Sequence, residues 1–175
     1  MAKNKNYTVR YKRKRLSKTD YSKRKGYLSS GKPRLVVRGS LNNILLQVVE
    51  FHPTGDKVVS TAHSSGLKKL GWKHHTGNIP SAYLTGYMLG KKAKVKEVVV
   101  DLGLSVATKG SRLFAAIKGV VDGGLNVPCS EGVFPKEDII KGNVIEKNYE
   151  KIKKQYKTPP IGMVKDFETV RDKIK

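Results

Sequence analysis

The sequence RLVVRGSLNNILLQVVEFHPTGDKVVSTA, residues 34–62, decides the fold class of this chain. It contains three runs rich in β-branched and other apolar residues, at 34–40, 44–51 and 57–62, separated by short turns with Asn, Pro and Gly. Such runs are typical of β-strands, and short turns join strands that lie antiparallel. We therefore predict a three-strand antiparallel meander.

After residue 78 the pattern changes to helix, strand, helix. Pro80 suits the first turn of a helix because its missing N–H is not needed there, and the helix should run over 80–94. Residues 97–104, EVVVDLGL, have the composition of a buried strand, which after a long helix usually lies parallel in the sheet. Ser111 can cap a second helix that stops at Gly123. Together these elements predict an α/β fold with a mixed sheet.

The N-terminal segment holds most of the net charge. Up to Arg38 it has 14 basic residues and one acid, Asp20, which gives 14 − 1 = +13 of the total of +22. This density cannot be buried and favours a polyanionic partner. Lys and Arg neutralise phosphates, and the interleaved tyrosines can stack on unpaired bases: Tyr7, Tyr11, Tyr21 and Tyr27. We predict nucleic-acid binding; the alternative is a solvated, disordered basic tail.

Within this segment, residues 1–18 lack apolar periodicity and are expected to be extended or disordered without a partner. A short helix should begin at Thr19 and Asp20, which are good capping residues, and end before Gly31 and Pro33. The chain is thus expected to have three parts: a basic arm (1–32), an α/β core (33–130) and a helical extension (131–175).

Two other segments carry weaker patterns. Residues 63–78 are rich in Gly and His and predict a loop, in which His74 and His75 form a polar or RNA-touching surface. The extension has apolar residues at helical spacing and predicts two amphipathic helices, with Ile145, Tyr149, Ile152 and Tyr156 in one and Val164, Phe167, Val170 and Ile174 in the other. We expect these apolar faces to pack on the core or on a neighbouring molecule.

The sequence gives little support for catalysis. Asp101 and Asp122 suit a ribonuclease-H-like nuclease, but the first strand and the Pro80 helix offer no third acid to hold two metal ions. We expect both carboxylates to pair with nearby Lys or Arg. The histidines and the lone Cys129 have no zinc-type spacing. The P-loop-like stretch 86–92, GYMLGKK, has the wrong glycine spacing, and its glycines are expected to permit close helix–sheet packing. No enzyme activity, metal or cofactor is expected.

The start of the second long helix is a lesser candidate for binding anions. Residues 108–112 combine free helical N–H groups with a hydroxyl and two cations, from Ser111, Lys109 and Arg112. A phosphate seat and an ordinary capped helix start are equally compatible with this pattern.

The cysteine count and the length of the apolar runs indicate the cellular compartment. The single cysteine allows no internal disulfide and fits a reducing environment. Apolar runs fall short of the roughly 18 residues that span a bilayer, and the sequence MAKNKN at the start lacks the apolar core of a signal peptide. We expect a cytosolic protein.

Three long stretches resemble a known family: residues 18–38 (KTDYSKRKGYLSSGKPRLVVR), 78–93 (NIPSAYLTGYMLGKKA) and 98–128 (from VVVDLGL to KGSRLFAAIKGVVDGGLNVP). They are similar to ribosomal protein L-eighteen, the 5S-rRNA-binding family of the large ribosomal subunit, in its archaeal branch. The resemblance implies an α/β sheet with ribonuclease-H-like strand order and no catalytic carboxylates. The tail after residue 142 departs from the family pattern.

The resemblance also implies a function and partners. It predicts a structural constituent of the cytoplasmic large ribosomal subunit that binds 5S rRNA and helps anchor it to 23S rRNA in the central protuberance, beside ribosomal protein L-five. Carried onto this chain, the expected RNA contacts are Arg10, Lys12, Arg13, Lys14, Arg15, Lys18, Tyr21, Lys23, Arg24, Lys32, Arg34 and Arg38, with Lys109, Ser111 and Arg112 as lesser candidates.

Overall fold

Four strands form one mixed sheet in the computed structural model, which describes residues 8–152 and 159–174. They are β1 (Arg34–Gly39), β2 (Ile44–Glu50), β3 (Lys57–His63) and β4 (Val99–Asp101). The order is β3-β2-β1-β4, in which β1 and β3 lie antiparallel to β2 and β4 lies parallel to β1. The predicted mixed α/β class is confirmed, including the parallel direction of the fourth strand.

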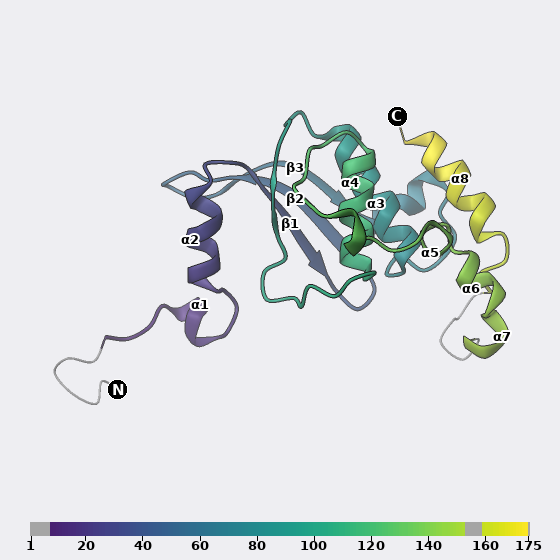
Figure 1. The fold of residues 1–175 in the computed structure, drawn as a ribbon, viewed down its shortest axis with the longest axis horizontal. Coiled ribbons are helices and arrows are strands. Elements are labelled where there is room, and N and C mark those ends of the chain that lie inside the picture. Colours follow the sequence, from purple (N-terminus) through teal and green to yellow (C-terminus); the bar gives the residue numbers. More distant parts are fainter. Residues whose placement is uncertain (1–7, 153–158, 175) are drawn as a thin grey trace.

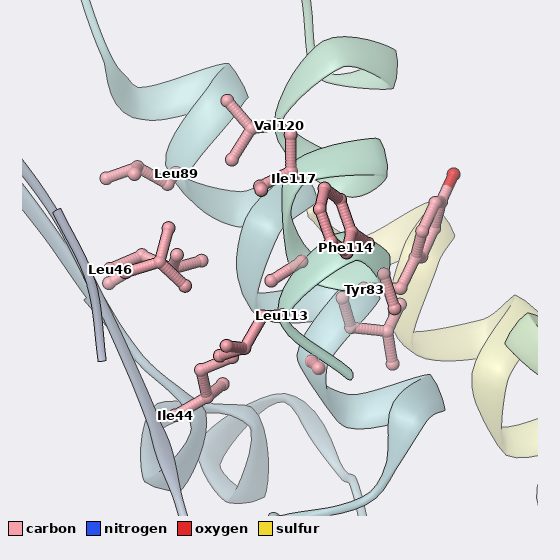
Figure 2. Packing of buried hydrophobic residues seen from close by; sticks show 14 of the residues in the cluster. Ile44, Leu46, Tyr83, Leu89, Leu113, Phe114, Ile117 and Val120 are labelled. Carbon is pink, nitrogen blue, oxygen red and sulfur yellow. The ribbon is translucent and has the colours of Figure 1, made fainter. Parts of the chain in front are cut away.

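Two long helices pack against one face of this sheet (Figures 1 and 2). They are α3 (Ile79–Lys92), which has Pro80 in its first turn as predicted, and α4 (Arg112–Asp122). Side chains alternate between the two faces of a strand, so every second residue of β1 and β2 points at these helices. The fully buried members of this set are Leu35, Val37, Leu46 and Val48.

The described part of the chain forms further helices. Each is too short or too polar to cross a membrane, as are α3 and α4. They are α1 (Lys12–Arg15), α2 (Tyr21–Ser29), the 3-10 helices η1 (Ser64–Leu70) and η2 (Glu131–Val133), α5 (Glu137–Lys141), α6 (Asn143–Lys147), α7 (Tyr149–Ile152) and α8 (Met163–Lys173).

The prediction of an extended or disordered N-terminus was wrong for residues 12–15, which form the single turn α1; residues 1–7 lie outside the described part. The predicted helix after Asp20 is confirmed as α2.

β4 is shorter than the strand predicted over 97–104. On its N-terminal side the chain turns to the segment after α4, where the N–H of Val98 donates to the carbonyl of Asn126 at 3.2 Å. On its C-terminal side Gly103 has a φ of 63°, which ends the extended conformation. Apolar composition shows that the segment is buried but not which neighbour takes its hydrogen bonds.

The loop predicted over 63–78 is partly helical, because η1 occupies its first half. The ring nitrogen Nδ1 of His63 accepts a hydrogen bond from the N–H of Ser65 at 3.2 Å where η1 begins. The expected exposed His74 is only 8% exposed, and its Nε2 lies 3.0 Å from a carboxylate oxygen of Asp166 on α8. Its ring meets that of the buried Trp72 edge-on, with centroids 5.1 Å apart. His74 therefore joins the C-terminal helix to the core.

The glycines of α3 and α4 bring these two helices together. A Cβ on Gly86 would overlap the carbonyl oxygen of Ala116 in α4, and a Cβ on Gly119 would overlap the carbonyl oxygen of Tyr83 in α3. The contact continues at Gly90, where a Cβ would lie 2.7 Å from the Cα of Gly123. The expected helix–sheet role of these glycines was therefore wrong: they allow two helical backbones to touch.

The C-terminal helix α8 completes the hydrophobic core. Of its predicted apolar stripe, Phe167, Val170 and Ile174 are buried in the same cluster as the sheet and α3. Val164 is only half-buried, and the neighbouring Met163, which was not predicted, is buried in its place. The ring of Phe167 lies 5.6 Å from that of Tyr83, centroid to centroid. The other predicted helix is interrupted at Asn148, between α6 and α7, and its part over 153–158 lies outside the described residues. The boundary placed at residue 131 stays a prediction.

Replacing Gly86 with Ala is expected to lower the free energy of unfolding by roughly 1–3 kcal/mol, because the added methyl group meets backbone that cannot rotate away. Unfolding in urea, followed by the fluorescence of the buried Trp72, measures this change. Gly26→Ala is the matched control, since a Cβ there meets nothing within 4 Å. Equal stabilities for Gly86→Ala and the parent chain would contradict the close helix contact.

Candidate nucleic-acid interface

The described part of the basic arm, residues 8–32, lies at one end of the molecule, and α8 lies at the other (Figure 1). α2 begins where a carboxylate oxygen of Asp20 accepts hydrogen bonds from the N–H groups of Ser22, at 3.0 Å, and Lys23, at 3.2 Å. This confirms the predicted cap. A capped start matters here because α2 contains no buried residue and takes little stability from packing.

The arm and the sheet enclose an open cleft of about 570 Å³. One wall comes from α1, α2 and the link between them. The other is the face of the sheet turned away from α3 and α4, which we call the free face. The cleft is lined by six cationic side chains, three carboxylates and several apolar groups, among them Arg13, Lys18, Lys23, Arg24, Arg34, Arg38, Asp20, Asp56, Asp101, Val36 and Val58.

Charged side chains on the free face form a connected network. Arg34 is 4% exposed, and its guanidinium donates to Asp101 at 3.1 Å and to Asp56 at 2.6 Å. Arg38 donates to the other carboxylate oxygen of Asp101 at 3.0 Å, and Arg24 of α2 binds both oxygens of Asp56, at 3.0 and 2.9 Å. The predicted pairing of Asp101 with arginine is confirmed. A buried guanidinium is tolerated only with partners of this kind.

The other predicted carboxylate is also paired. Asp122 lies 3.1 Å from the ammonium of Lys118 and accepts a hydrogen bond from the hydroxyl of Tyr83 at 2.8 Å. Burial and this acceptor raise the pKa of the Tyr83 hydroxyl. In the described part of the chain, no group of three or more His, Cys, Asp or Glu side chains could hold a metal ion.

The predicted cationic RNA contacts between residues 10 and 38 divide into two groups. Within the described residues, one group is exposed and takes part in no salt bridge: Arg10, Lys12, Arg13, Lys14, Arg15, Lys18 and Lys23. The other group is engaged with carboxylates of the same chain: Arg24, Arg34, Arg38 and Lys32, whose ammonium lies 2.6 Å from Glu97 and lowers the pKa of that carboxyl. Only the first group offers its charge freely to a partner.

Aromatic rings accompany these cations. Tyr21 is half-buried against Tyr11, with ring centroids 5.3 Å apart, and Tyr11 itself is 72% exposed. The expected contacts include Tyr21 but not Tyr11, which the structure shows to be the more accessible ring. Tyr27 faces the charge network; burial, followed by the negative charge of Asp101, raises the pKa of its hydroxyl.

The lesser candidate at the start of α4 is less open than its sequence indicates. The Oγ of Ser111 is buried without a hydrogen-bond partner and does not cap the helix. Arg112 is half-buried and donates to the carbonyl of Gly77 at 3.2 Å. Lys109 is exposed. Of the three side chains, only that of Lys109 is freely presented to an anion.

A family model described as "Ribosomal large subunit proteins 60S L5, and 50S L18" matches residues 5–97 and 90–130. These segments cover more than half of the chain. The chain belongs to this ribosomal family. It is therefore a protein of the large ribosomal subunit, a ribonucleoprotein in which it binds rRNA and takes part in translation. The family implies a structural role and is generally non-enzymatic.

For this ribosomal protein, the matched segments contain the arm, the sheet, α3 and α4, and thus both walls of the cleft. The helices α5 to α8 lie beyond them. Asp56 is the site residue that sequence reasoning missed. It is a single acid in the turn between two strands, and its partners lie 22 and 32 residues away, so no local pattern marks it.

Replacing Arg34 with Ala is expected to lower the free energy of unfolding by about 3 kcal/mol or more, because it leaves Asp101 and Asp56 without their shared buried partner. Arg10→Ala removes the same charge from an exposed position and should change the stability by less than about 0.5 kcal/mol. Urea unfolding of both variants measures the difference. Similar stabilities would contradict a structural role for Arg34.

Proposed function

We propose that this chain binds 5S rRNA through its arm and cleft, and helps anchor it to 23S rRNA in the central protuberance beside ribosomal protein L-five. The observation that carries the proposal is a set of seven exposed cations on residues 10–23, next to an open cleft, that form no salt bridge with the residues that the structure describes. A basic surface of this kind is the electrostatic footprint of nucleic-acid binding.

The shape of the surface favours folded RNA over sequence reading in a groove. The major groove of A-form RNA is too narrow for side chains, so proteins contact its backbone and its unpaired bases. The exposed cations of α1 suit phosphates, and the exposed ring of Tyr11 suits a stacked base. Arg34 is excluded from this set, because its burial assigns it to the scaffold of the cleft.

The strand order supports a finer description of the fold. Three consecutive antiparallel strands followed by a parallel fourth, in the order β3-β2-β1-β4, fit a meander with ribonuclease-H-like topology. In such a nuclease the carboxylates would hold metal ions. Here Asp101 uses both oxygens to bind Arg34 and Arg38, which supports a structural role without hydrolysis.

Deleting residues 1–30 is expected to abolish tight binding to 5S rRNA while the core stays folded. In the full chain, five or six phosphate contacts should make log K fall against log salt with a slope of about −4 to −5, from roughly 0.7–0.9 per contact. Filter binding over a salt series, with tRNA as competitor, measures both properties. Undiminished binding by the truncated chain, or equal affinity for tRNA, would refute the proposal.

A smaller change tests the position of the contacts. Lys12→Gln with Lys14→Gln should reduce the salt slope by about 1.5 and weaken binding, since two phosphate contacts are lost. Lys68→Gln with Lys69→Gln is the matched control, because these exposed lysines lie on η1, which packs against α3 and α8. The control pair should retain most of the affinity. Equal losses for the two pairs would show that net charge alone governs binding.

A further inference from the structure

Asp56 is one of three carboxylates in a cleft that six cationic side chains also line. It lies in the turn between β2 and β3, directly before Lys57. Its carboxylate binds Arg24 of α2 with both oxygens and Arg34 of β1 with one of them. A negative charge here repels phosphate, so on electrostatic grounds alone it weakens binding.

The attachment of α2 to the body of the protein depends on this carboxylate. α2 has no fully buried residue, and Tyr21, Tyr27 and Leu28 are only half-buried, so apolar packing holds it weakly. Among the described residues, and apart from the capping bonds at its own two ends, the only hydrogen bonds from α2 to the rest of the fold are the two from Arg24 to Asp56. The next connection along the chain is Lys32 to Glu97, beyond the end of the helix, where both side chains are about half exposed.

Asp56 is itself held in place from the other side. Arg34 is buried and donates to Asp101, which also accepts from Arg38. Arg24 is thus linked to β4 through an alternating series of charges: Arg24, Asp56, Arg34, Asp101. Both hydrogen bonds from Arg24 leave the same nitrogen, Nη2, and hydrogen bonds between ionised partners are stronger than those between neutral groups. The series therefore ties α2 to the sheet over the free face.

We propose that Asp56 is a positioning residue of the RNA interface, which holds α2 and its cations over the cleft in the geometry that a folded RNA requires. Arg24 is the arm's anchor in this arrangement, and its charge is used within the protein. That the ligand is RNA rests on the proposed function. The attachment of α2 by Asp56 does not depend on it.

A purely electrostatic role and a positioning role of Asp56 predict opposite changes in RNA affinity when Asp56 is replaced. If it acts only through its charge, Asp56→Asn raises the formal net charge from +22 to +23 and tightens binding to any RNA. If it positions α2, the same change weakens binding to 5S rRNA because the arm must be ordered when the RNA binds. Loss of a charge-assisted pair corresponds to roughly a tenfold loss of affinity.

The experiment uses the full chain and 5S rRNA at fixed salt, with Asp56→Asn compared with Glu50→Gln. Glu50 is exposed at the end of β2 and, in the described structure, forms no salt bridge, so it gives the same charge change without the contact. We expect about tenfold weaker binding for Asp56→Asn and equal or tighter binding for Glu50→Gln. Equal or tighter binding for Asp56→Asn overturns the proposal.

A second readout needs no RNA. Hydrogen exchange of the α2 amides should be severalfold faster in Asp56→Asn than in the parent chain or Glu50→Gln, while exchange in α3 is unchanged. Arg24→Gln leaves the Arg34–Asp56 pair intact and should give the same faster exchange in α2, which covers the case in which Asp56→Asn unfolds. Unchanged α2 exchange in Arg24→Gln overturns the positioning role. If the parent chain shows no preference for 5S rRNA, the proposed function fails, and the exchange result still decides the role of Asp56.

Discussion

A buried guanidinium is the constraint on which the two halves of this structure depend. Arg34 begins β1 on the free face of the sheet and is 4% exposed, so its charge must be satisfied within the protein. Asp101 from β4 and Asp56 from the β2–β3 turn supply the two carboxylates. Asp56 also binds Arg24, so the same carboxylate pairs with the buried arginine of the sheet and with the arginine that holds α2.

The sheet can combine these roles because its two faces have different chemistry. Every second residue of β1 and β2 is aliphatic and packs on α3 and α4, whose glycines let the helices lie close together. Of the alternate residues, Arg34 and Arg38 of β1 carry charges that face the arm, and Val36, Gln47 and Val49 line the cleft beside them. The period of two along a strand thus places a dry core and an ionic surface on opposite sides of one backbone layer.

Local patterns predicted much of this fold. The β-branched runs gave β1 to β3, and Asp20 and Pro80 marked the starts of α2 and α3, because strands, caps and first turns depend on residues a few positions apart. Contacts between distant segments escaped prediction. The partners of Asp56, the burial of His74 by Asp166 and the truncation of β4 each depend on a neighbour more than 20 residues away. Composition placed the cations in the arm but could not separate exposed Lys14 from buried Arg34.

The burial of Met163 and Phe167 beside Tyr83 bears on the order of events during synthesis. Protein chains emerge from the N-terminus, so the polycationic leader leaves the exit tunnel well before α8 exists. Until α8 is made, the hydrophobic core lacks Met163 and Phe167, and the basic arm is attached to an incompletely folded core. Nascent chains of this protein therefore carry their polycationic arm before their hydrophobic core is complete.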